Sequence, residues 1–121
     1  MALVTKGVAL VTGASQGIGR AIALRLAKDG YDIALNDIPA HEAMLGITAE
    51  EVASRGRRAH CVLADVSSEK QVETMVSDVV RALGGLDVVC TALPPRPDMR
   101  KHNPLTHGAI VHRWLQMLVS L

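Results

Sequence analysis

The segment VALVTGASQGIG at residues 8–19 joins an apolar run to a turn that contains three glycines. Residues 8–11 are all apolar, as expected for a strand that is buried on both faces of a sheet. From residue 18 to residue 29, apolar side chains recur at helical spacing, and Gly30 follows as a stop signal. The segment therefore predicts a strand, a tight turn and a helix in immediate succession.

Alternating strands and helices continue from this segment to about residue 90. The further predicted strands are residues 32–37, 58–64 and 86–90, and the further predicted helices are residues 40–54 and 72–83. Capping residues at 65–69 stand before the last helix, whose apolar side chains fall on one face. Helices between successive strands imply a parallel sheet with right-handed crossovers. We therefore predict an α/β fold: a partial Rossmann fold with a doubly wound parallel sheet of about four strands in the order 3-2-1-4.

The composition excludes several classes of protein. The chain has 121 residues, 49% of them hydrophobic, which allows one domain at most and excludes a disordered chain. Its 13 basic and 12 acidic residues give a net charge of +1, so we expect no nucleic acid and no membrane as a partner. The chain has two cysteines, no apolar signal segment at its start, and no apolar run near the ~20 residues of a membrane span. These features predict a cytoplasmic location.

The glycine-rich turn is the candidate ligand site. In a doubly wound sheet the ligand crevice lies between strands 1 and 4, at the carboxyl end of the first strand. Gly13 allows a tight turn, Gly17 allows a pyrophosphate to approach the backbone, and Gly19 allows the helix to pack close to the strand. The free N–H groups of the helix that starts near Ile18 can then hold a diphosphate. The alternative is that the glycines serve only as a turn between strand and helix.

An acidic residue accompanies the glycine turn. Asp37 ends the second predicted strand, eighteen residues after Gly19. A carboxylate at this place can accept hydrogen bonds from the adenosine ribose hydroxyls, and it would repel a 2′-phosphate. Neither Gln16 nor Ile38 offers a positive charge to a 2′-phosphate. The sequence therefore favours NAD over NADP as the cofactor.

The pattern Thr12-Gly13-x-x-x-Gly17-Ile18-Gly19 resembles the cofactor signature of the short-chain dehydrogenase/reductase family. Asp37, the pair Asp65-Val66 and the segment GLDVV at residues 85–89 are further matches. The resemblance covers about residues 5–90 and is strongest to the 3-oxoacyl-carrier-protein reductases and the acetoin (butanediol) dehydrogenases.

The resemblance implies a site for a nicotinamide dinucleotide. Its residues are Thr12, Gly13, Ser15, Gln16, Gly17, Ile18, Gly19, Asp37, Asp65 and Val66. By this resemblance, the Asp65 side chain and the Val66 backbone contact the adenine ring. Asp65 can also cap the helix that follows it, and the two roles do not exclude each other.

The resemblance ends after residue 90. Where the family has Asn-Asn-Ala-Gly or Ala-Asn-Ala-Gly, this chain has Thr91-Ala92-Leu93-Pro94. The family's catalytic pair is Tyr-x-x-x-Lys with an upstream serine, but the one tyrosine here is Tyr31, and Leu35 stands four residues later. We therefore predict no catalytic residue and no metal ligand in this chain, and we interpret it as the truncated cofactor-binding half of a longer enzyme.

Residues 94–121 differ in composition from residues 1–93. The first 93 residues include nine basic and eleven acidic ones, whereas the remainder has four basic residues, one acidic residue and four of the five prolines. We interpret residues 1–93 as a partial NAD(P)-binding domain and residues 94–121 as an irregular, basic, proline-rich linker that could form a short helix around Trp114.

Three hypotheses for the function follow. The first is a truncated relative of the NAD(P)-dependent oxidoreductases that act on CH–OH or carbonyl groups, inactive on its own. The second is a non-catalytic dinucleotide-binding or interaction module that pairs with a full-length relative through the exposed edge of the sheet. The third is a non-functional product of splicing or of the gene model. We take the first hypothesis as the main one, with NAD as the cofactor; binding of NADH would separate the first two hypotheses from the third.

Overall fold

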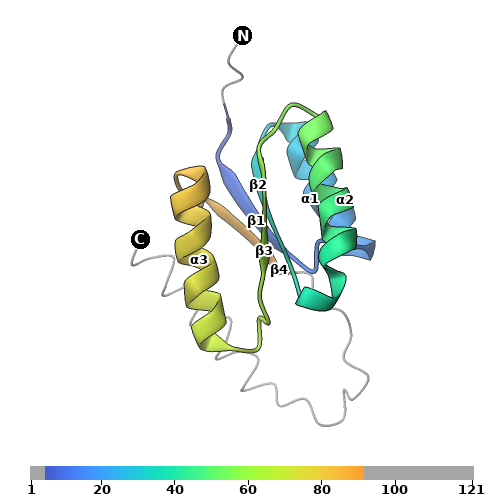
Figure 1. Ribbon diagram of the computed structural model, residues 1–121. Helices are drawn as coiled ribbons and strands as arrows, with labels where there is room; N and C mark the ends of the chain where they lie inside the picture. Colours follow the sequence, from blue (N-terminus) through green and yellow to red (C-terminus); the bar gives the residue numbers. More distant parts are fainter. Residues whose placement is uncertain (1–4, 92–121) are drawn as a thin grey trace.

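The computed structural model describes residues 5–91, in which a parallel sheet lies between two layers of helices (Figure 1). The elements in chain order are β1 (Val8–Thr12), α1 (Gly17–Asp29), β2 (Asp32–Asp37), the 3₁₀ turn η1 (Pro39–His41), α2 (Glu42–Ser54), β3 (Ala59–Leu63), α3 (Glu69–Leu83) and β4 (Val88–Thr91). The sheet has four parallel strands in the order β3-β2-β1-β4. The predicted fold class and strand order are therefore confirmed. The linker expected at residues 94–121, and the domain boundary at residue 93, lie outside the described residues.

The central strands are buried and the outer ones are partly exposed. All residues of β1 and β2 are buried, as expected for strands with neighbours on both sides. Thr12 of β1 is in register with Asn36 of β2 and with Thr91 of β4. Because all four strands are parallel, their carboxyl ends share one edge of the sheet, which we call the carboxyl edge.

The two faces of the sheet carry different helices. In Figure 1, α1 and α2 cover one face and α3 covers the other. Side chains of β1 and β2 alternate between the two cores, as the period of a strand requires. The core under α3 includes Val8, Leu10, Ala34, Val72, Met75, Val76 and Val79. The core under α1 and α2 includes Ala9, Val11, Ala23, Ala27, Ile33, Leu35, Leu45 and Val52.

A difference from the predicted elements lies at the start of the second helix. The sequence predicts a continuous helix over residues 40–54, but α2 begins at Glu42 and the 3₁₀ turn η1 precedes it. Pro39 explains the difference, since it holds Ile38 before it in an extended conformation and then starts the turn. The His41 N–H donates to the Ile38 carbonyl at 2.9 Å, which folds His41 back toward the end of β2.

Candidate functional site

The turn between β1 and α1 has a conformation that favours glycine. Gly13 and Gly17 have φ values of 63° and 60°, in the left-handed region. A Cβ added at Gly17 would meet no atom within 4 Å, so the space in front of this residue is open. A Cβ added at Gly19 would lie 2.1 Å from the carbonyl oxygen of Gly13. The helix can therefore pack this closely on the turn only with glycine at residue 19.

The N-terminus of α1 faces outward at this turn. Gln16 precedes the helix, and its side chain makes no capping hydrogen bond. The Arg20 N–H donates to the Gln16 carbonyl at 3.3 Å, so the amides of residues 17–19 precede the first hydrogen bond of the helix. Ile18 is 76% exposed, which leaves an apolar side chain beside these amides. Free amides and the positive end of the helix dipole suit a diphosphate.

Hydrogen bonds fix the glycine turn to the end of β2. The Ala14 N–H donates to the Asn36 carbonyl at 3.0 Å, and the Ser15 N–H donates to Asp37 Oδ2 at 3.3 Å. The buried Asn36 side chain in turn donates to the carbonyls of Val62 and Ala64, at 3.1 and 3.2 Å. The ends of β1, β2 and β3 are thus held together as one rigid surface at the carboxyl edge.

The Asp37 carboxylate accepts four hydrogen bonds. Its Oδ2 accepts from the Ser15 hydroxyl at 2.5 Å and from the Ser15 N–H, while its Oδ1 accepts from the Ile38 N–H at 2.8 Å. The fourth partner is His41, whose Nδ1 lies 2.9 Å from Oδ1. Burial alone would raise the pKa of Asp37, but the hydrogen bonds from Ser15, Ile38 and His41 outweigh it and hold the pKa below its ordinary value. The group is therefore ionised at neutral pH.

Asp32, at the other end of β2, has partners of a different kind. The guanidinium of Arg58 donates to Asp32 Oδ2 at 3.0 and 3.1 Å, and the Arg58 N–H donates to Oδ1 at 3.0 Å. Burial would raise the pKa of Asp32, but these bonds and the charge of Arg58 lower it. Asp32 is therefore neutralised by an arginine, whereas amides, a hydroxyl and an imidazole surround Asp37. The negative charge of Asp37 therefore lies at the carboxyl edge without an arginine or lysine beside it.

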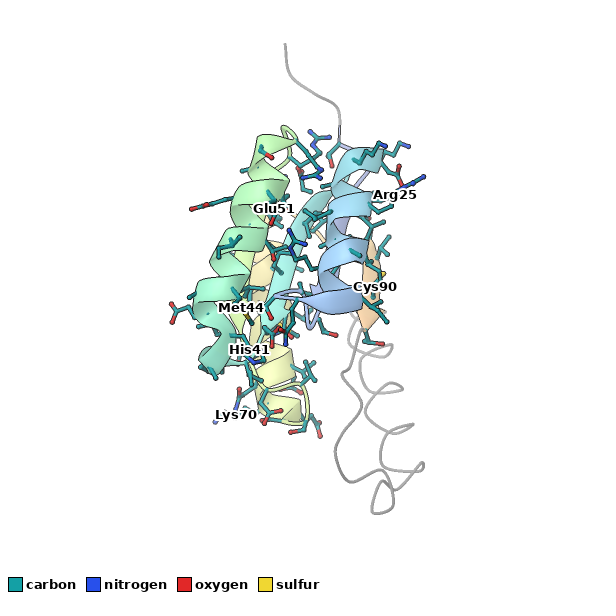
Figure 2. All side chains as sticks on the ribbon, turned by 90° about the vertical axis from the view of Figure 1, so that its right-hand side faces the viewer. Arg25, His41, Met44, Glu51, Lys70 and Cys90 are labelled. Carbon is teal, nitrogen blue, oxygen red and sulfur yellow. The ribbon has the colours of Figure 1, made fainter. Side chains whose placement is uncertain are left out.

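His41 is the site residue that sequence reasoning missed. Figure 2 shows it at the N-terminal end of α2, at the same end of the molecule as the start of α1. Its side chain is 33% exposed, whereas that of Asp37 is 10% exposed, so the imidazole covers part of the carboxylate. The sequence feature that could have revealed His41 is Pro39, because a turn that begins at this proline brings the chain back toward Asp37. We call Gly13–Gly19, Asp37 and His41 together the carboxyl-edge crevice, after the place where ligands bind in doubly wound sheets.

Asp65 and Val66 follow β3 at the same edge of the sheet. Asp65 is exposed, and its Oδ1 accepts from the N–H and the hydroxyl of Ser67 at 2.9 and 2.6 Å. The N-cap of α3 is Ser68, whose hydroxyl accepts from the Gln71 N–H at 3.3 Å. Asp65 therefore shapes the turn before the helix without being its N-cap. Val66 packs against the core under α3.

Thr12 carries a buried polar atom without a partner. Thr12 ends β1, is fully buried, and its Oγ1 makes no hydrogen bond within the part of the chain that the structure describes. A buried hydroxyl left unpaired costs about 1–3 kcal/mol. The free amides of α1 and the open space before Gly17 lie where β1 passes into α1, just beyond this buried hydroxyl in the chain. Such a set of donors fits a group with several phosphate and hydroxyl oxygens, such as a dinucleotide.

Two other side chains that could react, those of Tyr31 and Cys61, lie outside the carboxyl-edge crevice. Tyr31 directly precedes β2, at the end of the sheet opposite the carboxyl-edge crevice. Burial raises the pKa of the Cys61 thiol, which disfavours the reactive thiolate. These residues contain no cluster of three or more His, Cys, Asp or Glu that could hold a metal ion. In the same stretch, no helix combines the length and the apolar character that crossing a membrane requires.

Comparison with known proteins identifies a family and several relatives. The family model described as short chain dehydrogenase matches residues 7–93. A short-chain dehydrogenase/reductase of Armillaria gallica is 60% identical over 86 residues, which are 70% of this chain and 33% of that protein. The 3-oxoacyl-[acyl-carrier-protein] reductase FabG of Staphylococcus aureus is 42% identical over 81 residues, 67% of this chain and 32% of that protein. The chain thus spans about a third of the length of these curated relatives.

The fold is also similar to that of solved structures. A blue fluorescent protein from a metagenomic library, solved in complex with NADPH, superposes with a TM-score of 0.78 at 26% sequence identity. The match covers 98% of this chain and 52% of that chain. The resemblance deduced from the glycine pattern is therefore confirmed at the level of the family and of the fold.

Proposed function

The chain belongs to the short-chain dehydrogenase family, and on this basis we propose that the carboxyl-edge crevice binds a nicotinamide dinucleotide, with NAD preferred to NADP. One arrangement carries the proposal: the turn that leaves the first amides of α1 free is itself hydrogen-bonded to the Asp37 carboxylate. Donors for a diphosphate and an acceptor for a ribose are thereby fixed at neighbouring points of one rigid surface. A dinucleotide presents both groups at once.

The glycine turn would hold the diphosphate. The amides of Gly17, Ile18 and Gly19 donate to its oxygens, and the dipole of α1 stabilises its charge. The open space before Gly17 lets the phosphates approach the backbone. Gln16 lies at the N-cap beside them. Thr12 and Gly13 shape the base of the turn, where the Thr12 hydroxyl is a donor in need of an acceptor.

Asp37 would select the ribose. An ionised carboxylate accepts hydrogen bonds from the 2′- and 3′-hydroxyls of NAD, and it repels the 2′-phosphate of NADP. The low pKa of Asp37 supports this role because the charge persists throughout the physiological range. The Ser15 hydroxyl, which now donates to Asp37, is placed to reorient toward the diphosphate or the ribose.

Asp65 and Val66 would border the adenine ring. Both follow β3, next to the end of β2, because the Ala64 N–H donates to the Asp37 carbonyl at 3.1 Å. Val66 is partly exposed, so some of its atoms are accessible to a ring that lies beside the ends of β2 and β3. This placement supports the adenine role that the family resemblance implies for the two residues.

We propose binding without turnover for this chain. A bound nicotinamide ring supplies or accepts a hydride. The general acid that the family uses, Tyr-x-x-x-Lys, does not occur in the sequence. Residues 1–93 would be the dinucleotide-binding unit and residues 94–121 a linker. The oxidoreductase reaction of the relatives is proposed only for a protein that joins this unit to a catalytic segment.

A second candidate function is pairing with a longer relative, in a cytoplasmic setting. Within the described residues β4 pairs only with β1, so its other edge offers free backbone groups. Its residues Val88, Val89 and Cys90 are only partly buried. Co-purification with a full-length family member would support this function.

Calorimetric titration with NAD⁺ tests the proposed binding. We expect saturable binding to the 121-residue chain and loss of at least about tenfold in affinity for Gly17→Asp, because a carboxylate there would face the diphosphate.

Two matched controls separate the effect of the added charge from an effect on folding. Gly17→Ala has the same backbone strain without the charge and should weaken binding less. Gly85→Asp adds the same charge in open space before β4, at the opposite end of the sheet, and should bind as the unmodified chain does. Equal affinity of Gly17→Asp and Gly85→Asp would refute the proposal.

A further inference from the structure

We propose that His41 is a second determinant of dinucleotide choice, and that protonation of its imidazole shifts the preference of the crevice from NAD toward NADP. The inference rests on the proposed function, dinucleotide binding at the carboxyl-edge crevice, and names a regulation of that site. Its starting point is the contact of 2.9 Å between His41 Nδ1 and Asp37 Oδ1.

The Asp37 carboxylate has no unused acceptor position. Two oxygens offer about four lone-pair sites, and four donors already occupy them. A ribose that binds through two hydroxyls must therefore displace existing partners. The N–H groups of Ser15 and Ile38 belong to the backbone and are fixed, whereas the Ser15 hydroxyl and the His41 ring can rotate away. Ribose binding thus replaces the Ser15 hydroxyl at Oδ2 and the His41 imidazole at Oδ1 by the two ribose hydroxyls.

The cost of this exchange depends on the charge of His41. A neutral imidazole that leaves Asp37 gives up one hydrogen bond and regains one to water, since the side chain is 33% exposed. A protonated imidazole must in addition break an ion pair with the carboxylate. Protonation of His41 therefore disfavours the ribose of NAD.

The same protonation favours a 2′-phosphate. An imidazolium beside Asp37 cancels the negative charge that repels the phosphate, and it offers an N–H donor to the phosphate oxygens. Gln16 of the glycine turn and Ile38, which follows Asp37, are both uncharged, so neither offers a positive charge to a 2′-phosphate. The turn η1 supplies an ionisable group from four residues further on. The effect requires a protonated imidazole, so it is expected to grow as the pH falls.

The charged groups to be considered around His41 come from β2, α2, α1, the turn after β3 and α3. Asp37 faces it from β2, and Glu42 follows it at the start of α2. On α1, the guanidinium of Arg20 is committed to Glu51 of α2, at 2.5 and 2.6 Å. Beyond β3, Asp65 Oδ1 accepts from Ser67. Lys70 belongs to the first turn of α3, which covers the other face of the sheet, and it lies at the same end of the molecule as His41 (Figure 2).

The test compares NAD⁺ and NADP⁺ binding by calorimetry at pH 8.0 and pH 5.5, for the full chain and for His41→Gln. Glutamine keeps a polar side chain but cannot be protonated. We expect the ratio of the two dissociation constants, NADP⁺ over NAD⁺, to fall from pH 8.0 to pH 5.5 by roughly fivefold more in the unmodified chain than in His41→Gln, which is the scale of one partly exposed ion pair. The variant also accounts for the titration of the 2′-phosphate itself, which occurs in the same range.

A second readout does not depend on NADP⁺. Titrations with NAD⁺ at pH 6.5, in buffers that differ in ionisation enthalpy, should reveal release of a fraction of a proton on binding, and His41→Gln should abolish it. An equal pH response in the two proteins, with no proton release, would overturn the role of His41 while leaving NAD⁺ binding intact. If neither dinucleotide binds at pH 8.0, both this inference and the proposed function fail.

Discussion

At the residue scale, Asp32 and Asp37, at the two ends of β2, show that the partners of a carboxylate decide whether it serves the fold or can serve a ligand. Asp32 has an arginine partner and closes the sheet against Arg58. Asp37 is held by amides, a hydroxyl and an imidazole, so its charge has no permanent countercharge. Both carboxyls have a lowered pKa, and in each case hydrogen bonds outweigh the burial that would raise it. Of the two, only Asp37 can offer its charge to a ligand.

The substitution Asp37→Asn tests whether the ionised Asp37 carboxylate stabilises the fold. The carboxyl has a folded-state pKa below its ordinary value of 3.8, so its ionised form stabilises the fold above about pH 4. That contribution is lost as the pH falls through the lowered pKa. We expect Asp37→Asn to reduce the free energy of unfolding by about 1–2 kcal/mol at pH 7, because one set of charge-assisted hydrogen bonds is weakened. Urea denaturation at pH 7 and pH 3 measures the effect. The deficit should shrink at pH 3, and a deficit that is the same at both pH values would contradict this account.

The residue scale also marks where prediction from the sequence stopped. Asp37 and the three glycines could be found because their spacing along the chain reports a strand, a turn and a helix. The hydrogen bonds of Asp37 could not, because Ser15 lies twenty-two residues away and meets it only after β1 and β2 pair. His41 was accessible in principle, since Pro39 signals a turn just after Asp37.

At the element scale, the position of α1 relative to the glycine turn depends on residue 19 having no side chain. Gly19 lets the first turn of the helix rest on the carbonyl of Gly13, and this contact fixes where the free amides point. The hydrophobic pattern of the segment predicted that a helix exists, but not its distance from the turn. For the second helix the apolar pattern predicted a start at residue 40, and the 3₁₀ turn that occupies Pro39–His41 was missed.

Gly19→Ala and Gly46→Ala form a matched pair at this scale. A Cβ at Gly19 would stand 2.1 Å from a backbone oxygen, so α1 must move, and we expect a loss of about 2–4 kcal/mol in the free energy of unfolding. Gly46 lies inside α2, where a Cβ would meet nothing within 4 Å. Alanine there should stabilise the chain by about 0.5–1 kcal/mol, from helix propensity alone. Chemical denaturation of both variants measures the difference. If the Gly19 variant is as stable as the Gly46 variant, the close packing of α1 on the turn is not as described.

At the scale of the whole molecule, the order β3-β2-β1-β4 creates the crevice. The chain winds outward from β1 to β3 and then returns to the other side of β1, which puts α3 on the opposite face from α1 and α2 (Figure 1). Ligand crevices form where the winding direction reverses, and here that place is the carboxyl end of β1. This architecture was predictable because alternating strands and helices admit few right-handed arrangements. The comparisons with known proteins were needed to identify the relatives that share this architecture and the fraction of their length that this chain matches.

The central claim is that a nicotinamide dinucleotide binds at the carboxyl edge of this sheet. The direct measurement is a nitrogen–proton correlation spectrum of the 121-residue chain during titration with NAD⁺. We expect the largest amide shifts at Gly13–Gly19 and at residues 37–41, which the fold brings together at that edge. Amides at the opposite end of the sheet, such as those of Lys6 and Arg57, should hardly move. Saturable shifts at the carboxyl edge are the predicted result, and absent shifts, or shifts concentrated at the opposite end, would contradict it.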